Sequence, residues 1–429
     1  MRITLILSAA LALLLFGILA VFAPRNTITV VSEGLSGVTD PAIVDVLSSG
    51  ASRNAPRARA EPQENEDIPK QVPLPNPPEI VKGIYLTSWS AGAPLTMKRV
   101  TDLLEGTELN GVVIDIKDFS GSVAYRTGLA QVLAAGAEDD IRIRYPHRLI
   151  KDLHDRGVYV IGRVSVFQDS VLAKARPELA LRDTSTGEAW TDRKGLAWMD
   201  SASREVWEYN AAIAEDALSR GFDEINFDYV RFASDGDLER IAHPVWDERT
   251  PKADVMRDFF SFLRSRLPGA KISADLFGLT TVNKGDLGIG QVIESAYEYF
   301  DFVSPMVYPS HYAPGFLGYK NPAAYPYEVV KYSMDNALSK IGRLTNILNA
   351  SSTASSTPFA IRSLRAKLRP WLQDFDLGAM YDETMVRAEI RATEDALVRG
   401  SSTDRYAGWL LWDPANKYTE GALESAGDE

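Results

Sequence analysis

Short apolar runs alternate with longer amphipathic segments from about residue 80 to the end of the chain. Eight runs have the length of buried strands, and they occupy residues 82–89, 111–119, 157–167, 222–232, 271–279, 301–310, 368–375 and 407–414. The segments between them include two helix candidates, 203–221 and 382–400, each of which ends at a glycine. Strands that alternate with helices are typical of a parallel sheet, and eight repeats predict an α/β fold, the (β/α)8 TIM barrel.

The N-terminus carries a different pattern, an uncharged apolar run from Ile3 to Ala23. As a helix, such a run can cross a bilayer core of about 30 Å, and it is longer than the apolar part of a cleaved signal, which has about 7–15 residues. Cleavage after Ala23 would leave Pro24 directly behind the cut, which disfavours cleavage. We therefore expect residues 1–24 to form a signal anchor, a transmembrane helix, with a cleaved signal as the alternative. In both cases the rest of the chain is extracytoplasmic, in the periplasm or at the cell surface.

The stretch between this run and the first predicted strand is rich in proline. Residues 24–79 hold nine of the 23 prolines and no Trp, Tyr or Phe. A segment without large apolar side chains buries too little surface to offset its ordering entropy. We expect residues 25–79 to be a flexible, extended linker and residues 80–429 to be the folded domain.

Composition and charge exclude several classes of function. The net charge of −12 disfavours a nucleic-acid partner, because phosphate binding needs a basic face. The chain has no cysteine, so disulfides, thiolate metal sites and cysteine nucleophiles are excluded. Its four histidines never occur four residues apart, as a zincin helix requires, and we expect neither a cofactor nor a metal.

Polar and aromatic side chains gather where the apolar runs end. In a TIM barrel these ends meet at one face, where active sites lie. The candidate substrate-binding residues at the run ends are Trp89, Asp115, Lys117, Asp118, Arg231, Tyr308, His311, Trp412 and Asp413. The first and eighth runs are neighbours in a closed barrel, so Trp89 and Trp412 are predicted to flank the same part of a cleft and to stack on sugar rings.

Asp228 and Asp275 close the fourth and fifth of these runs and are the candidate catalytic pair. Asp228 alternates with Asn226 and Glu224, so all three side chains point into the barrel or all point away. Arg231 follows Asp228 by three residues and could hold it ionised, either as part of the site or as a structural ion pair. Asp275 has no cation nearby in sequence and is the better candidate for a raised pKa, although an aspartate here could also start a turn.

Two further pairs of charged residues allow a structural interpretation. Asp115 and Lys117 lie two residues apart on one face and could form an internal ion pair. Asp223 and Glu224 follow the helix stop at Gly221, where capping or solvent exposure is expected.

Two carboxylates in a cleft rich in Trp and Tyr are what hydrolysis of a glycosidic bond requires. One carboxyl protonates the leaving oxygen and needs a raised pKa, while the other stays ionised as nucleophile or base. Serine-hydrolase chemistry fits poorly because the chain has no G-x-S-x-G motif, and no P-loop or dinucleotide fingerprint follows a strand.

The strings GIYLTSW, GVVIDIKDFSG, GFDEINFDYVRF, SADLFG, MVYPSHY and GWLLWDPANKY occur in this order over residues 82–418. The sequence thereby resembles a glycoside hydrolase domain family, formerly classed as a domain of unknown function, whose TIM barrel is distantly similar to the α-amylase superfamily. The resemblance implies that Asp228 is the nucleophile and that the acid/base is Asp275. Amylase-like enzymes usually carry Glu at the fifth-strand position, and the Asp here is one methylene shorter.

Together these observations predict an exported, membrane-tethered glycosidase that acts on an extracytoplasmic polysaccharide. Its expected partners are a polysaccharide or oligosaccharide substrate and the membrane, which it contacts through its N-terminal helix. One alternative is a carbohydrate-binding barrel of the cell envelope without catalysis. Another is a metal-dependent hydrolase or deacetylase, with Asp115, Asp118, Asp228 and Asp275 as oxygen ligands for a hard cation.

Overall fold

The computed structural model describes residues 67–354, 364, 366–398 and 403–427. The predicted anchor, residues 1–24, and the linker up to residue 66 lie outside these ranges. Among the residues that the structure describes, no helix combines the length and the apolar character needed to cross a membrane.

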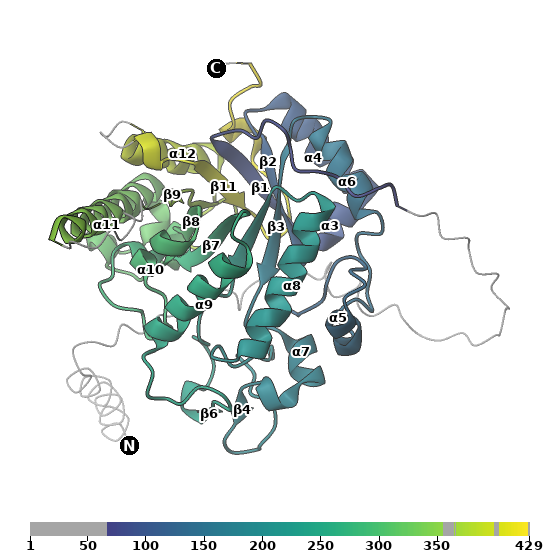
Figure 1. Ribbon diagram of the computed structural model, residues 1–429. Coiled ribbons are helices and arrows are strands. Elements are labelled where there is room, and N and C mark those ends of the chain that lie inside the picture. The colour runs from purple at the N-terminus through teal and green to yellow at the C-terminus, as the bar shows by residue number, and fades with distance from the viewer. Residues whose placement is uncertain (1–66, 355–363, 365, 399–402, 428–429) are drawn as a thin grey trace, which may run out of the picture. The chain divides into compact units, whose positions relative to one another are not determined.

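The described residues form a closed barrel of eight parallel strands, so the predicted fold is confirmed for this part of the chain (Figure 1). The strands are β1 (Val81–Leu86), β2 (Gly111–Lys117), β3 (Tyr159–Ser165), β5 (Glu224–Asp228), β7 (Lys271–Phe277), β8 (Phe302–Met306), the split pair β9 (Lys367–Leu368) and β10 (Trp371–Gln373), and β11 (Gly408–Trp412). β9 and β10 act as one barrel strand, because β8 pairs with both of them. Pro370, which has no N–H for the ladder, lies between the two parts. Pairing of β11 with β1 closes the barrel.

Helices surround the strands, and a small two-stranded sheet is added outside them (Figure 1). The helices are α3 (Ser88–Gly92), α4 (Pro94–Gly106), α5 (Ala130–Ala135), α6 (Pro146–His154), α7 (Ser170–Ala175), α8 (Arg204–Arg220), α9 (Lys252–Arg266), α10 (Ile293–Tyr299), α11 (Pro326–Ala354) and α12 (Glu383–Leu397), and the small sheet pairs β4 (Arg182–Asp183) with β6 (Ile241–Ala242). Both helix candidates from the sequence are present. α8 begins after Ser203, whose side chain accepts from the amide of Val206, and ends at Gly221, whose φ of 108° suits glycine. α12 ends at Leu397, and Gly400 lies outside the described residues.

The barrel interior contains charged as well as apolar layers. Glu224, Asn226 and Asp228 all point the same way, as their alternation predicts, and the structure shows that this direction is inward: the first two are fully buried and Asp228 is 7% exposed. The expectation that Glu224 caps or faces solvent is wrong, because it forms an ion pair with Arg369, and both side chains are completely buried. A buried carboxylate without such a partner would cost several kcal/mol.

The segment from Asp67 to Ile80 is extended but packed against the barrel. The Asp67 carboxylate accepts a 2.8 Å bond from the amide of His147 in the first turn of α6, where a negative charge is favourable. The amide of Leu74 donates to Asp223 over 2.6 Å. Contacts with the barrel therefore begin by Asp67, within the range expected to be linker.

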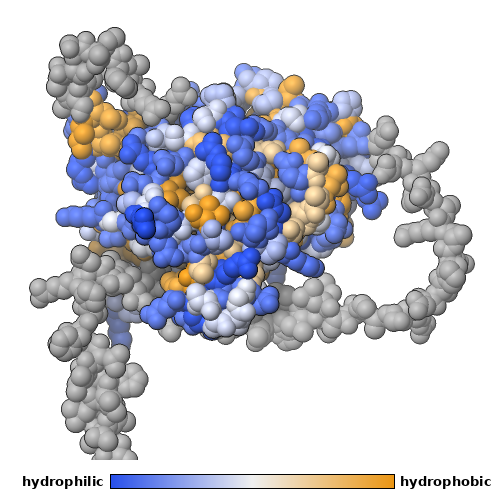
Figure 2. Space-filling view, turned by 60° about the horizontal axis from the view of Figure 1, so that its bottom comes forward, coloured by the Kyte–Doolittle hydropathy of each residue, from blue (hydrophilic) through white to orange (hydrophobic). Residues whose placement is uncertain are grey.

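The face of the molecule in Figure 2 is mostly hydrophilic, with apolar residues in groups between the polar ones. Single exposed apolar residues are ordinary on a folded domain and need no partner.

Candidate active site

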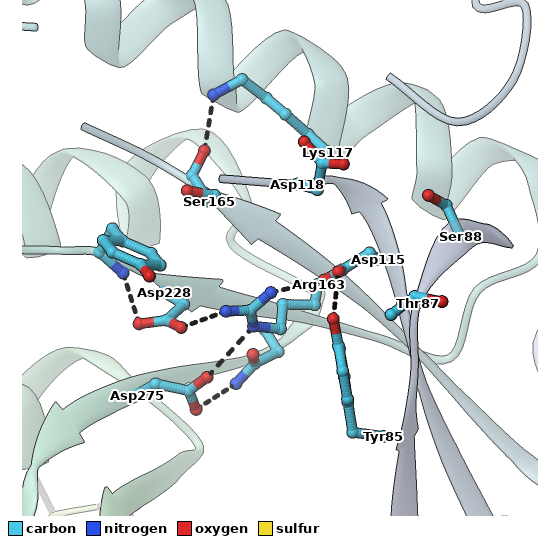
Figure 3. Close-up of polar contacts among 12 residues, drawn as sticks. Tyr85, Thr87, Ser88, Asp115, Lys117, Asp118, Arg163, Ser165, Asp228 and Asp275 are labelled. Atoms are coloured by element: carbon cyan, nitrogen blue, oxygen red, sulfur yellow. Dashed lines mark hydrogen bonds and ion pairs between the residues drawn. The ribbon is translucent and has the colours of Figure 1, made fainter. Parts of the chain in front are cut away.

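The candidate site is built around Arg163, a β3 residue whose side chain is 3% exposed. Its guanidinium forms ion pairs with Asp115 from β2 and Asp228 from β5, and its Nε lies 3.8 Å from Asp275 Oδ2 on β7 (Figure 3). We call these four residues the Arg163 cluster. Sequence reasoning missed Arg163, although a single arginine in the otherwise apolar run 157–167 was a signal that it has buried acidic partners.

Asp228 is the last residue of β5 and receives two donors. Arg163 Nη2 donates to its Oδ2, and the amide of Tyr229 donates to its Oδ1 over 2.5 Å. Tyr229 has a φ of 53°, in the left-handed region that residues other than glycine rarely adopt. A guanidinium and a backbone N–H thus both donate to the Asp228 carboxylate.

Asp275 lies deeper, with 1% of its surface exposed. Its Oδ1 accepts from Asn226 Nδ2 over 2.8 Å and from Trp371 Nε1 over 2.7 Å. Burial, followed by the negative charge of Asp228, raises the pKa of Asp275 to about 8. The predicted raised pKa is therefore found, and Asp275 is mostly protonated at neutral pH.

Asp115 joins the same cluster, but Lys117 does not. Asp115 accepts from Arg163 and from the Tyr85 hydroxyl, and burial raises the pKa of its carboxyl. The pairing of β2 with β3 shifts register between Asp115 and Lys117, so the two side chains do not share a face. Lys117 is fully buried and pairs with Asp169 over 2.7 Å, so neither the predicted Asp115–Lys117 ion pair nor a substrate contact by Lys117 fits this structure.

Asp118 and Asp413 lie at the predicted strand ends and organise the local chain. Asp118 pairs with Arg142, and its Oδ1 accepts from the amide of Ser120 over 2.9 Å. Asp413 Oδ1 accepts from the amides of Ala415 and Lys417 over 2.7 and 3.0 Å. Both carboxylates therefore stabilise the turns that follow β2 and β11.

The two predicted tryptophans differ in their surroundings. Trp412 stacks on Tyr85, with ring centroids 3.8 Å apart and an interplanar angle of 15°, and its ring lies 5.1 Å from the guanidinium of Arg163. Trp89, in α3, is 60% exposed and has the guanidinium of Arg142 over its ring at 4.7 Å. Trp412 thus covers the Arg163 cluster, while Trp89 offers a free indole face.

Tyr308 and His311 follow β8. Tyr308 is buried in the barrel interior, in one apolar cluster with Tyr85 and Trp371. Burial and then the charge of Asp275 raise the pKa of Tyr308, which is evidence that it faces the candidate catalytic pair. His311 is exposed, and its ring lies 5.3 Å from that of Tyr308 in an edge-on contact.

Arg231 is not the partner of Asp228 that the sequence suggested. Its guanidinium lies over the rings of Trp198, Tyr229 and Phe277, at 4.8, 5.3 and 4.7 Å. Arg163 takes the expected role instead, because β3 pairs directly with β5 and brings residue 163 beside Asp228.

The four carboxylates considered as metal ligands do not come together as one group. Asp118 pairs with Arg142, and the other three surround the cation of Arg163. Within the described ranges, no group of three or more His, Asp or Glu side chains is arranged to hold a metal ion.

A cavity of about 850 Å³ lies elsewhere in the barrel. Its lining includes Leu74, Pro77 and Phe222, together with Lys271 at the start of β7. It therefore opens at the N-terminal ends of the strands, and the Arg163 cluster is at the other end.

Comparison with known proteins assigns the chain to a family. Residues 83–418 match the family described as "Putative glycosyl hydrolase domain". No curated protein matches the chain.

A solved structure of a hypothetical protein from Ruminiclostridium thermocellum ATCC 27405 is 35% identical over 45% of this chain and 96% of its own, with a TM-score of 0.41. An α-galactosidase from Thermus thermophilus is 18% identical over 64% of this chain and 51% of its own, with a TM-score of 0.39. The glycoside hydrolase domain of PelA from Pseudomonas aeruginosa is 13% identical over 81% of this chain and 98% of its own, with a TM-score of 0.38. The family match spans most of the chain and nearly the whole barrel, and the chain therefore belongs to the family of putative glycosyl hydrolase domains.

Proposed function

We propose that this protein is a glycosidase that cleaves a polysaccharide outside the cytoplasm, with Asp228 as the ionised carboxylate and Asp275 as the acid. Family membership supports the reaction class. The assignment of roles rests on one observation: the two carboxyls contact the same guanidinium differently. Arg163 donates a hydrogen bond to Asp228, whereas its Nε lies 3.8 Å from Asp275 Oδ2.

The two carboxyls have different surroundings. Asp228 accepts from the guanidinium of Arg163 and from the amide of Tyr229, and we assign it the ionised role. Asp275 is buried beside that charge, and its pKa of about 8 keeps a proton available at neutral pH. Pairs of carboxyls whose environments separate them in this way divide the acid and nucleophile roles in glycosidases.

In the proposed reaction, Asp275 gives its proton to the glycosidic oxygen as the bond from that oxygen to the anomeric carbon breaks. Asp228 either attacks the anomeric carbon or takes a proton from the attacking water. Because Asp275 is 1% exposed, its proton reaches the substrate through a bridging water or after the carboxyl turns away from Trp371.

Single amide substitutions test this mechanism. Wild type is first screened on polysaccharides and aryl glycosides to find substrates, and Asp228→Asn is expected to abolish their hydrolysis with folding preserved. Asp275→Asn should lower turnover of a natural glycan by about 100-fold or more, and less for aryl glycosides, whose leaving groups need little protonation. Asp155→Asn is the matched control, because this aspartate is exposed and pairs with Lys151 on the surface. Equal rates for wild type and Asp228→Asn would rule out the mechanism.

A carbohydrate-binding barrel without catalysis is the second candidate. The deep burial of Asp275 and its two hydrogen bonds to Asn226 and Trp371 favour this function. It predicts that wild type binds glycans and hydrolyses none of them, and that Asp228→Asn leaves binding nearly unchanged.

The proposed location is the outer side of a membrane, with residues 1–24 as an uncleaved anchor. The support is the apolar run from Ile3 to Ala23 and the proline that follows it. Cell fractionation should recover the full-length chain with membranes, and N-terminal sequencing should find the original start. A mature N-terminus at or soon after Pro24 would contradict the anchor.

A further inference from the structure

Arg231 is a buried arginine held in a cage of aromatic rings. It is 9% exposed, and Trp198, Tyr229 and Phe277 contact its guanidinium on their ring faces. Such cation–π contacts fix the orientation of a guanidinium without neutralising its charge. The side chain is therefore preorganised, but it remains a full positive charge.

No carboxylate among the described residues forms an ion pair with this guanidinium. Only Nη1 of Arg231 is used by its neighbours: it donates to Ser234 Oγ over 2.7 Å and to the carbonyl of Phe232 over 3.3 Å. In the described part of the chain Arg231 makes no ion pair, and its Nε and Nη2 donate to no protein acceptor. Neither of these two nitrogens is sealed off from solvent.

The nearby carboxylates already have other partners or lie out of contact. Asp228 is bound to Arg163. Asp192 accepts from Gln168 Nε2 over 2.6 Å and from Trp198 Nε1 over 3.1 Å. Asp192, Asp228 and Asp235 influence Arg231 electrostatically, but burial outweighs them and lowers the pKa of the guanidinium below its ordinary value. Burial of a cation without a contacting anion is unfavourable, and it is typical of a site that receives its anion from a ligand.

The position of Arg231 connects it with the candidate catalytic pair. Its cage is made by Tyr229, the residue after Asp228, and by Phe277, two residues after Asp275. The guanidinium thus lies between the ends of β5 and β7, the strands that carry the two carboxyls.

We propose that Arg231 binds a carboxylate of the glycan, so that the substrate is an acidic polysaccharide that contains uronic acid or another carboxylated sugar. The inference rests on the proposed glycosidase function and names its substrate class. The free Nε–Nη2 edge has the geometry for two parallel hydrogen bonds to a carboxylate, the arrangement in which arginine recognises this group most specifically. A neutral chain would leave the same edge without an anion.

The test compares acidic oligosaccharides with the same chains after reduction of their carboxyls to alcohols. The probes are oligogalacturonides and glucuronate-containing oligosaccharides, each beside its reduced form, and the dissociation constants are measured calorimetrically on the full-length protein. Wild type should bind the best acidic chain about 10- to 100-fold more tightly than its reduced form. Arg231→Gln should remove this difference, and Arg231→Lys should restore part of it, since lysine keeps the charge but not the two-pronged edge.

Arg204→Gln is the matched control, because Arg204 also lies over aromatic rings, at 4.0 Å from that of Phe262, but sits on the outer helix α8. It should keep the wild-type preference for the acidic chain. Thermal unfolding of each variant separates loss of binding from loss of folding. If Arg231→Gln does not fold, the test rests on Arg231→Lys, which should prefer the acidic chain over its reduced form less strongly than wild type does.

Equal affinity for acidic and reduced chains, no binding of any acidic chain, or an unchanged preference in both Arg231 variants would overturn the proposal. These outcomes are distinct from failure of the glycosidase function. Hydrolysis of neutral glycans without any preference for acidic ones would remove the carboxylate site and keep the enzyme. Arg231-dependent binding of acidic chains without hydrolysis would keep the site and favour the carbohydrate-binding barrel.

Discussion

Replacement of Arg163 by methionine removes the cation that contacts all three carboxyls of the cluster. Methionine is of similar length and is uncharged, so the change deletes the charge and leaves most of the packing against Trp412. Asp115, Asp228 and Asp275 would then face one another in the barrel without a counter-ion. Loss of one partner from a buried ion pair costs about 3–5 kcal/mol, and we expect Arg163→Met to lower the free energy of unfolding by this amount near pH 8.

The loss of unfolding free energy in Arg163→Met should grow as the pH rises. Burial already raises the pKa of Asp115, and that of Asp275 is about 8, while unfolded aspartates titrate near about 4. Without Arg163 the folded-state pKa values rise further, so the folded state holds protons that the unfolded chain has released. Stability of the variant therefore falls relative to wild type as pH rises from about 4 towards 8, and the deficit is smallest in acid.

Urea unfolding of wild type and Arg163→Met at about pH 5 and pH 8 measures both quantities. Arg176→Met is the control: Arg176 pairs with Glu178 and Glu205 on the surface with 42% of its side chain exposed, so its loss should change the unfolding free energy by less than about 0.5 kcal/mol. Addition of Asp115→Asn to Arg163→Met should restore part of the stability, because one buried charge is removed. A deficit of equal size at both pH values, or none at pH 8, would refute the electrostatic account of the cluster.

Three further outcomes follow from named contacts. The kcat/KM of wild type on its best substrate should decline as pH rises through about 8, where Asp275 loses its proton, and a profile still flat at about pH 9 would argue against Asp275 as the acid. Trp89→Ala should change the unfolding free energy by less than about 0.5 kcal/mol, because Trp89 is 60% exposed. Trp412→Ala should lower it by more than about 1 kcal/mol, because the change removes the stack on Tyr85. Equal losses in urea unfolding would contradict this difference. A chain that starts at Glu79 should unfold at lower urea than one that starts before Asp67, since it lacks the Asp67–His147 and Leu74–Asp223 hydrogen bonds, and identical midpoints would show that this segment contributes nothing.

The sequence alone predicted the barrel and the two candidate carboxyls. Each strand is an apolar run bounded by turn residues. Such a run can be recognised from its own residues, without knowing which strand it pairs with. The positions of Asp228 and Asp275 follow from the same pattern, because strand ends in a parallel barrel meet at one face. That Asn226 points the same way as Asp228 follows from a period of two along the strand, while the inward direction of both was decided by the fold.

The partners of these residues were decided only by the tertiary structure. Arg163 lies 65 residues before Asp228 and 48 after Asp115, and only pairing of β3 with its neighbours brings the three together. Arg231, although three residues from Asp228, lies in an aromatic cage that includes Tyr229, a residue in the left-handed conformation directly after the strand. A register shift in β2 likewise separates Lys117 from Asp115. Sequence distance therefore misassigned the ion pairs: a buried charge takes the counter-ion that strand register and backbone direction bring within reach, whichever residue is nearer along the chain.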